Sequence, residues 1–151
     1  MDRTGEILNM VFIKTINMKD YRIVKVIFPT RDECFMIEKY DPIYNKYMEY
    51  YSKNNLSGKY LNFFEAYKDF IAIKNTYLKA VEFFPDPKKS DMNQGFLVKK
   101  NLKTSRYEIW KVYKKLFSHK YSLKFIYNHC YIIKDVIDYI KYNYYSNKTI
   151  F

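Results

Sequence analysis

The feature of the sequence that most constrains its fold is an apolar seam near the carboxyl end. Its members are separated by alternating steps of four and three residues, the spacing of one face of an α-helix. They are Ile126, Cys130, Ile133, Ile137, Ile140 and Tyr144. The seam predicts a helix over about 121–145. We expect this face to pack into the core rather than against a second chain.

Three further segments favour helices. Thr30–Glu33 and Ser105–Glu108 both fit the capping box, in which a hydroxyl and a carboxylate cap the first turn of a helix. They predict helices over about 31–52 and 105–117. Apolar residues at three- and four-residue spacing predict another over about 59–84, which two prolines then end.

The first thirty residues favour β structure instead. Met10–Ile16 and Tyr21–Phe28 are rich in β-branched and aromatic residues, and a short polar segment separates them. We predict a β-hairpin over about 10–28, with a four-residue turn at Asn17–Asp20. A helix over 6–16 is the competing interpretation.

Residues 85–104 are predicted to form a loop that holds at most one short strand. No repeat and no Gly/Ser-rich or acidic linker divides the chain. A chain of 151 residues can bury roughly 70% of its unfolded surface in one core. The sequence therefore predicts a single domain over 1–151. Its fold class is α+β, mostly α-helical with an N-terminal β-hairpin, and an all-α bundle is the alternative.

Composition excludes several classes of protein. An apolar content of 48% argues against a disordered chain. Charges interrupt every apolar run before the ~20 residues that a membrane span needs. The first six residues lack the basic and apolar regions of a secretory signal. We therefore expect an intracellular protein of a reducing compartment, with no transmembrane segment.

The residues that usually carry catalysis or bind metals are sparse. Cys34 and Cys130 cannot form a disulfide scaffold or a four-ligand zinc site, and His119 and His129 are the only histidines. The three glycines are isolated, so no phosphate-binding loop is present. We predict no metal, no cofactor and no enzymatic activity.

Two acidic pairs are the remaining candidates for acid–base chemistry. Asp32 and Glu33 stand at a predicted helix start, where carboxylates stabilise the helix dipole. Asp135 and Asp138 are expected to lie on a polar helix face. A structural role is therefore the favoured interpretation of both pairs.

The charge of the chain is concentrated in one segment. The formal net charge is +11, and residues 88–124 hold eleven basic residues against two acidic ones. The abundance of Lys, Asn, Ile, Tyr and Phe is typical of an A/T-rich genome. That bias acts on the whole chain, so it does not explain a local excess. A field of one sign attracts polyanions.

From this segment we predict a small non-enzymatic basic domain that binds RNA or a ribonucleoprotein assembly. On the predicted 105–117 helix, aromatic residues alternate with cations, as in proteins that bind single-stranded or looped RNA. Packing of the aromatic residues inward, leaving a lysine stripe outside, is the simpler interpretation. The candidate nucleic-acid-binding residues are Lys99, Lys100, Lys103, Arg106, Lys111, Lys114, Lys115, Lys120 and Lys124.

A protein–protein interaction module is the alternative function. Such a module would be an accessory subunit of a large complex, or a viral or pathogen factor that engages a host protein. Eighteen tyrosines favour it, because tyrosine is enriched at interfaces. Its partner would then present an acidic surface to the basic segment.

Overall fold

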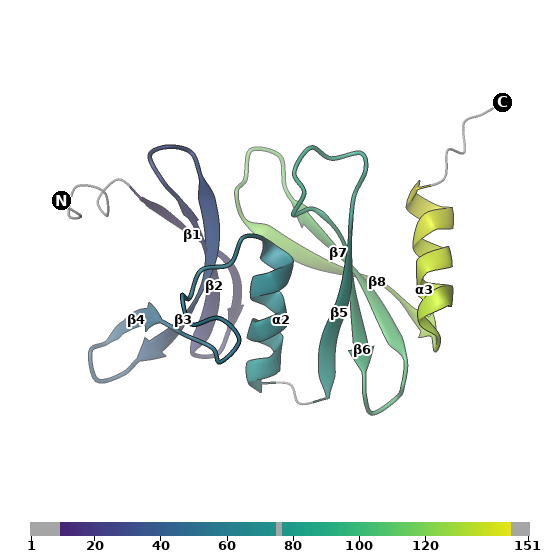
Figure 1. Cartoon of the computed structure of the whole chain (residues 1–151), viewed down its shortest axis with the longest axis horizontal. Coiled ribbons are helices and arrows are strands. Elements are labelled where there is room, and N and C mark those ends of the chain that lie inside the picture. Colours follow the sequence, from purple (N-terminus) through teal and green to yellow (C-terminus); the bar gives the residue numbers. More distant parts are fainter. Residues whose placement is uncertain (1–9, 75–76, 146–151) are drawn as a thin grey trace. The chain divides into compact units, whose positions relative to one another are not determined.

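The protein is mostly β in the computed structural model, which describes residues 10–74 and 77–145. The strands form two four-stranded antiparallel sheets, β1-β2-β3-β4 and β5-β6-β7-β8, each in sequence order (Figure 1). Contacts divide the chain into two units. The first holds the described residues up to Phe70 together with Lys115–Lys120, and the second holds the others.

The first sheet is built from short strands joined by tight turns. They are β1 (Val11–Met18), β2 (Tyr21–Ile27), β3 (Glu33–Asp41) and β4 (Lys46–Glu49). One face carries an apolar cluster of Val24, Val26, Cys34 and Met36. Because side chains alternate along a strand, Phe35 lies on the other face, where its ring packs edge-on against Phe63 at a centroid distance of 6.0 Å.

Phe63 belongs to the helix α2 (Phe63–Lys74). The backbone N–H of Glu65 donates to the side-chain oxygen of Asn62 at 2.9 Å, which caps the first turn. Phe63, Tyr67 and Phe70 recur at helical spacing and are buried. The segment before α2 joins the sheet, because Phe35 and Tyr60 exchange two backbone hydrogen bonds of 2.8 Å.

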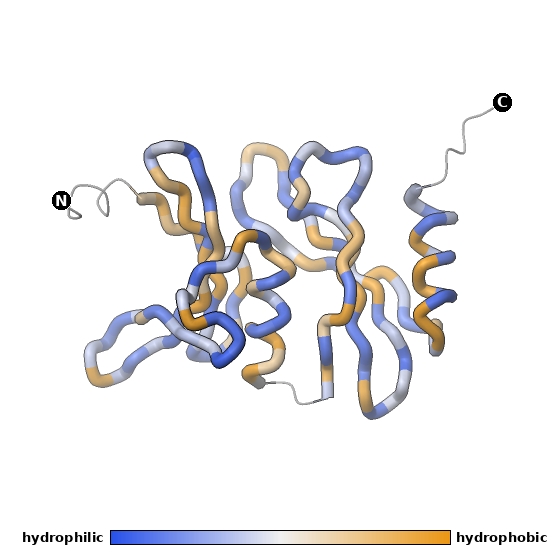
Figure 2. Tube along the Cα trace, in the orientation of Figure 1, coloured by the Kyte–Doolittle hydropathy of each residue, from blue (hydrophilic) through white to orange (hydrophobic). Residues whose placement is uncertain are grey.

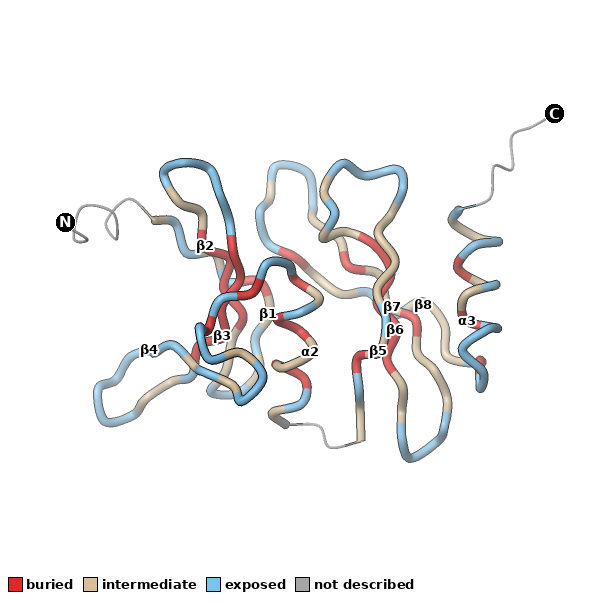
Figure 3. The backbone as a smooth tube through the Cα atoms, in the orientation of Figure 1, coloured by how far each residue is buried: buried red, intermediate tan, exposed pale blue. Residues whose placement is uncertain are grey.

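The second sheet has a helix of its own. Its elements are β5 (Leu78–Pro85), β6 (Gly95–Asn101), β7 (Tyr107–Lys114), β8 (Tyr121–Cys130), α3 (Ile133–Ile140) and the π-helical turn η1 (Lys141–Tyr145). Phe96, Val98 and Ile109 from the sheet form one core cluster with Val136 and Ile140 from α3. The longest runs of buried residues lie in β2, β3 and β6 (Figure 3), and these runs are mostly apolar (Figure 2).

The prediction of a mostly α-helical fold is wrong, and so is the alternative of an all-α bundle, because the chain forms two sheets. The predicted helix 31–52 is replaced by β3 and β4, and the helix 105–117 by β7. The predicted helix 59–84 is α2 followed by β5, and the predicted loop 85–104 contains the strand β6.

Both predicted capping boxes lie in hairpin turns. Arg31 and Ser105 adopt positive φ values of 70° and 60°, which a helical first turn does not allow. A hydroxyl and a carboxylate at this spacing also suit a turn, since short polar side chains bond to nearby backbone groups there. The helical spacing that followed each box arose because aromatic and aliphatic residues fill nearly half of the chain.

The apolar seam is split between two elements. Ile126 and Cys130 lie in β8, and the remaining members lie in α3 and η1. The predicted helix over 121–145 is therefore correct only for its second half. Within α3 the buried residues are Val136 and Ile140, whereas Ile137 is half-buried. The buried face of α3 is therefore centred on Val136 and Ile140, which pack against the second sheet, rather than on the predicted seam.

The predicted N-terminal β-hairpin is confirmed by the antiparallel pairing of β1 with β2. Its turn is shorter than predicted, since β1 ends at Met18 and β2 begins at Tyr21. Asp20 supplies the positive φ of 68° that such a turn needs. The competing helix over 6–16 is wrong from Val11 onward, and residues 6–9 lie outside the described part. The single-domain assignment stays a prediction.

Gly95 offers a test of the second sheet. A Cβ atom at this position would lie 2.2 Å from the backbone oxygen of Phe84 and 2.8 Å from the Cα of Pro85. We expect Gly95→Ala to lower the free energy of unfolding by at least about 2 kcal/mol, because backbone rather than a flexible side chain must move. Chemical denaturation measures the change. The control Ser90→Ala, at an exposed loop position, should leave stability unchanged. Equal stability of the two variants would contradict this packing.

Candidate functional site

The nine predicted nucleic-acid-binding residues lie on β6, β7, β8 and the turns between them, not on a helix. Neighbouring residues of a strand point to opposite faces. The lysine stripe expected on a 105–117 helix is therefore not formed. Lys111 is paired with Lys124, and Lys114 with Tyr121, on opposite faces of the sheet. The nine residues separate into groups with different surroundings.

Lys99 is buried, with 5% of its surface exposed. Its ammonium lies 4.3 Å from the centroid of the Trp110 ring. Burial lowers the pKa of Lys99 to about 8, although the nearby Glu108 carboxylate acts in the opposite direction. The ammonium of Lys99 is therefore inside the protein and does not face a polyanion.

Lys114 is neutralised by a carboxylate. Its ammonium lies 3.0 Å from Asp91, and the hydroxyl of Tyr121 donates to the same carboxylate at 2.6 Å. Burial alone would raise the pKa of Asp91, but the hydrogen bonds from Tyr121 and the backbone of Asn93, together with Lys114, lower it. Asp91 is thus ionised and offsets the charge of Lys114.

Four further lysines remain available at the surface. Lys111 and Lys124 lie directly opposite each other on β7 and β8. Lys115 and Lys120 are exposed in the β7–β8 turn, which belongs to the first unit. By their contacts, Lys111 and Lys124 belong to the second unit, and Lys115 and Lys120 to the first.

The remaining three residues, Lys100, Lys103 and Arg106, lie together at the β6–β7 turn. The pairing of β5 with β6 adds Lys79, which lies opposite Lys100. Each of the three interacts with a tyrosine ring. We call this group the turn cluster; its members are Lys79, Lys100, Lys103, Arg106, Tyr77, Tyr107 and Tyr131.

Cation–ring contacts organise the turn cluster. The ammonium of Lys103 lies 4.3 Å from the centroid of Tyr77, and that of Lys100 lies 5.4 Å from the centroid of Tyr107. The guanidinium of Arg106 lies 5.4 Å from the centroid of Tyr131, and its Nε donates to the Tyr131 hydroxyl at 2.7 Å. These contacts direct cations and rings to one end of the sheet.

The turn that carries the cluster is ordered by its own side chains. The side-chain oxygen of Asn101 accepts hydrogen bonds from the backbone of Lys103 at 2.9 Å and of Thr104 at 3.2 Å. The backbone of Leu102 donates to the carbonyl of Tyr77 at 2.7 Å. Tyr77 and the turn are thereby held together before any ligand arrives.

Within the described part of the chain, no carboxylate neutralises the turn cluster. In residues 10–74 and 77–145, none of its four cations lies within salt-bridge distance of Asp or Glu. Tyr131 is 55% exposed, so part of its ring is available for stacking. The cluster can therefore contact phosphates through its cations and bases through its rings.

Sequence reasoning missed Lys79, Tyr77 and Tyr131. Each of them is separated from the β6–β7 turn by more than twenty residues of sequence, the first two before the turn and Tyr131 after it. Lys79 lies on β5, and Tyr131 follows β8 directly. Only the register of four strands brings them to the same end. The exposed cations of the turn itself were the one signal that the sequence contained.

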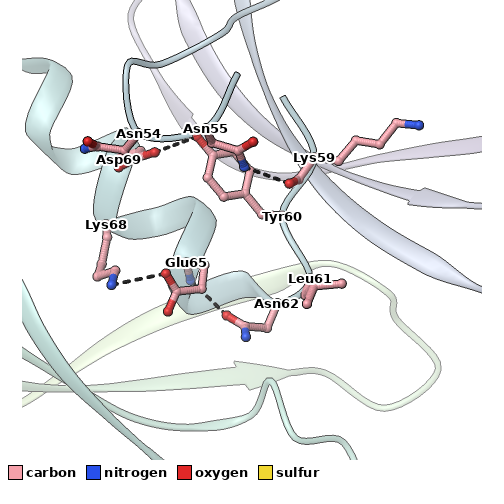
Figure 4. A pocket seen from close by; sticks show the side chains of 9 residues that line it. All are labelled: Asn54, Asn55, Lys59, Tyr60, Leu61, Asn62, Glu65, Lys68 and Asp69. Carbon is pink, nitrogen blue, oxygen red and sulfur yellow. Dashed lines mark hydrogen bonds and ion pairs between the residues drawn. The ribbon is translucent and has the colours of Figure 1, made fainter. Parts of the chain in front are cut away.

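A polar pocket of about 590 Å³ lies in the first unit, beside α2 (Figure 4). The residues that line it are Asn54, Asn55, Lys59, Tyr60, Leu61, Asn62, Glu65, Lys68 and Asp69. Several of their polar atoms bond to one another. Lys68 pairs with Glu65 at 3.1 Å, and the amide of Asn55 donates to the carbonyl of Lys59 at 2.7 Å. The Asn55 bond stabilises the loop before α2, and the Lys68–Glu65 pair lies within the helix.

Tyr60 and Asp69 anchor this loop to the helix. The Asp69 carboxylate accepts hydrogen bonds from Tyr60 at 2.7 Å and from Ser52 at 2.8 Å. Burial raises the pKa of Tyr60 to about 12; Asp69 adds to the shift, and the Ser52 hydrogen bond opposes it. A tyrosine with a raised pKa is a poor nucleophile at neutral pH, so the arrangement favours a structural role.

The other chemically active residues are dispersed. Glu33 pairs with Lys25 at 3.0 Å, whereas Asp135 and Asp138 are exposed on α3. Cys34 and Cys130 are unpaired and buried, and burial raises the pKa of both thiols. Within the described residues, no three His, Cys, Asp or Glu side chains gather into a metal-binding group.

Comparison with known proteins gives no match: no family model, no curated protein and no solved structure resembles the chain significantly. In the described residues, the helices are too short and too polar to cross a membrane. The first six residues, which argued against a secretory signal, lie outside the described part.

The burial of Lys99 has a testable pH dependence. Its pKa is about 8 in the folded protein and 10.5 in the unfolded chain. Between these values the unfolded chain binds more protons, so this group makes stability rise with pH. We expect Lys99→Met to raise the free energy of unfolding by about 1–3 kcal/mol at pH 7. The advantage over wild type should shrink towards pH 10.5, as chemical denaturation across this range measures.

The matched control for Lys99 is Lys89→Met, which removes an exposed lysine. It should change stability little at any pH. A loss of stability in Lys99→Met that persists at pH 10.5 would show that the ring contact outweighs the cost of burying the charge.

The raised pKa of Tyr60 predicts that the protein loses stability in alkali. Its pKa is raised from 10 to about 12 in the folded protein, so its contribution is complete below pH 10 and is lost as the pH rises towards 12. Tyr60→Phe should cost about 1 kcal/mol at pH 7, because one hydrogen bond to Asp69 is removed. The difference from wild type should fall between pH 10 and 12, measured by denaturation. A constant difference would contradict the raised pKa.

Proposed function

We propose that the protein binds single-stranded nucleic acid, with RNA as the favoured ligand, through the turn cluster. The observation that supports the proposal most is the gathering of four cations and three tyrosines with no carboxylate partner in the described residues. Such a surface attracts phosphates electrostatically. It also offers ring faces on which unpaired bases stack.

The chemistry of the cluster suits single strands better than duplexes. Bases in a duplex are stacked on each other, so a protein ring can reach them only when the strand is open. Tyr131 is the most exposed ring and follows the end of β8. Lys103 lies on the turn itself and is exposed. A single strand of nucleic acid that crosses this end of the sheet would place its phosphates against the cations and one of its bases against the Tyr131 ring.

The proposed binding site is smaller than the whole basic segment 88–124 that the sequence indicated. Lys99 and Lys114 are excluded because one is buried and the other is paired with Asp91. Backbone contacts of this kind carry little sequence information, so we expect weak preference among sequences. Binding should depend strongly on salt, because each phosphate contact releases counterions.

A pair of charge-matched variants tests the site. We expect K100E/K103E to weaken binding of labelled oligo(U) at least about tenfold at low salt, measured by fluorescence anisotropy. It should also reduce the dependence of affinity on salt. The control K88E/K89E makes the same charge change in the exposed β5–β6 loop, at the opposite end of the strands. It should cost less than about threefold.

Tyr131→Ala separates stacking from charge. We expect it to weaken binding about five- to tenfold without changing the salt dependence. An oligo(dT) of equal length distinguishes DNA from RNA. Absence of binding to either oligonucleotide at low salt, or equal weakening by both charge variants, would overturn the proposal.

A further inference from the structure

The β7–β8 turn exposes two large apolar side chains at its tip. Leu116 and Phe117 are neighbours in the chain, and their exposed fractions are 84% and 97%. Part of the turn has hydrophobic colour in Figure 2, and the turn is pale blue, meaning exposed, over most of its length in Figure 3. Single exposed apolar residues are common, but an adjacent pair at a turn is a candidate for contact with an apolar phase.

The turn holds this pair in a fixed conformation. The backbone N–H of Ser118 donates to the carbonyl of Lys115 at 3.0 Å, and that of Lys120 donates to the Ser118 hydroxyl at 3.1 Å. Phe117 adopts a φ of +63°. A bulky residue in this region is strained, and the position normally takes Gly or Asn.

Among the described residues with positive φ, Phe117 is the one apolar residue. Four other non-glycine residues of the described part have positive φ, and all four are polar: Asp20, Arg31, Asn45 and Ser105. Gly or Asn at position 117 would relieve the backbone strain, and any polar residue would relieve the cost of exposing an apolar side chain. Strain of this kind is found where a side chain has a function in that position.

The surroundings of the tip are cationic. Lys115, His119 and Lys120 are exposed on either side of the apolar pair. No acidic residue occurs in the sequence between Glu108 and Asp135. The tip thus has an exposed apolar pair with exposed lysines before and after it in the chain.

We propose that the β7–β8 tip, Lys115–Lys120, is a docking site for anionic phospholipid membranes. Leu116 and Phe117 enter the boundary between headgroups and acyl chains, while Lys115 and Lys120 contact lipid phosphates. This order of apolar and basic groups matches the order of layers that a protein meets at a membrane surface. The assignment does not depend on nucleic-acid binding, because it uses none of the turn cluster.

A membrane fits the tip better than a nucleic acid or a protein groove. Leu116 has no ring to stack on a base, yet it is exposed almost as fully as Phe117. A protein groove would not require cations on both sides of the pair. Two apolar side chains and a few charges give reversible, weak binding, so we expect attachment only to membranes that contain anionic lipid.

Co-sedimentation of the full chain with vesicles tests the site. We expect binding to phosphatidylcholine vesicles that contain phosphatidylserine, and little binding to pure phosphatidylcholine. L116S/F117S should reduce binding at least about tenfold. K115E/K120E should reduce it similarly and remove its salt dependence. Thermal denaturation should show that both variants remain folded, since all four side chains are exposed.

The matched control is I43S/Y44S, at the β3–β4 turn. Ile43 and Tyr44 are also exposed, by 85% and 67%, but Asp41 stands beside them. This variant should bind vesicles as wild type does. In a gain-of-signal experiment, Phe117→Trp should show a blue shift of its fluorescence with anionic vesicles, whereas the single Trp110 of wild type should not.

Three results would overturn the assignment. The first is no binding to vesicles with phosphatidylserine. The second is equal loss of binding in L116S/F117S and I43S/Y44S, which would indicate unspecific adsorption. The third is loss of oligo(U) binding, with vesicle binding unchanged, in L116S/F117S; the tip would then contact nucleic acid. Failure of the nucleic-acid proposal alone would leave the vesicle results unaffected.

Discussion

A central strand buried on both faces is the constraint on which each sheet depends. Five consecutive residues are buried in β3, Cys34–Glu38, and five in β6, Gly95–Lys99. A strand of this kind needs apolar cover above and below, because its side chains alternate between the two faces. Phe63 of α2 covers one face of the first sheet, and α3 covers one face of the second.

The same constraint determines which contacts the charged side chains in these strands make. Each buried run ends in a charged residue. Glu38 accepts a hydrogen bond from Arg22 at 2.7 Å, and the ammonium of Lys99 lies over the Trp110 ring. Burial of an ionised group costs free energy unless a partner compensates it. Lys99 is thus part of the packing, while the cations beyond the end of β6 remain available for a ligand.

The two proposed surfaces differ in chemistry because they lie on different turns. The β6–β7 turn is polar, and its backbone is satisfied by Asn101, so its cations can rest on tyrosine rings. The β7–β8 turn carries an apolar pair in a strained conformation. The residues next to each turn set these properties locally. Which other residues join a turn is decided by strand register, as Lys79 opposite Lys100 shows.

The sequence by itself determined the N-terminal hairpin, the apolar character of the core and the excess of cations in residues 88–124. These properties depend on residues close together in the chain. The tertiary structure decided that the apolar run at Cys34–Ile37 is a strand, because a short buried strand and a buried helix have similar composition. It also decided which cations are exposed: Lys99 and Lys100 are neighbours, yet only the pairing of β6 with β5 and β7 turns one inward and the other outward. Contacts between distant strands have no local signature, and for this reason the turn cluster could not be predicted from the sequence.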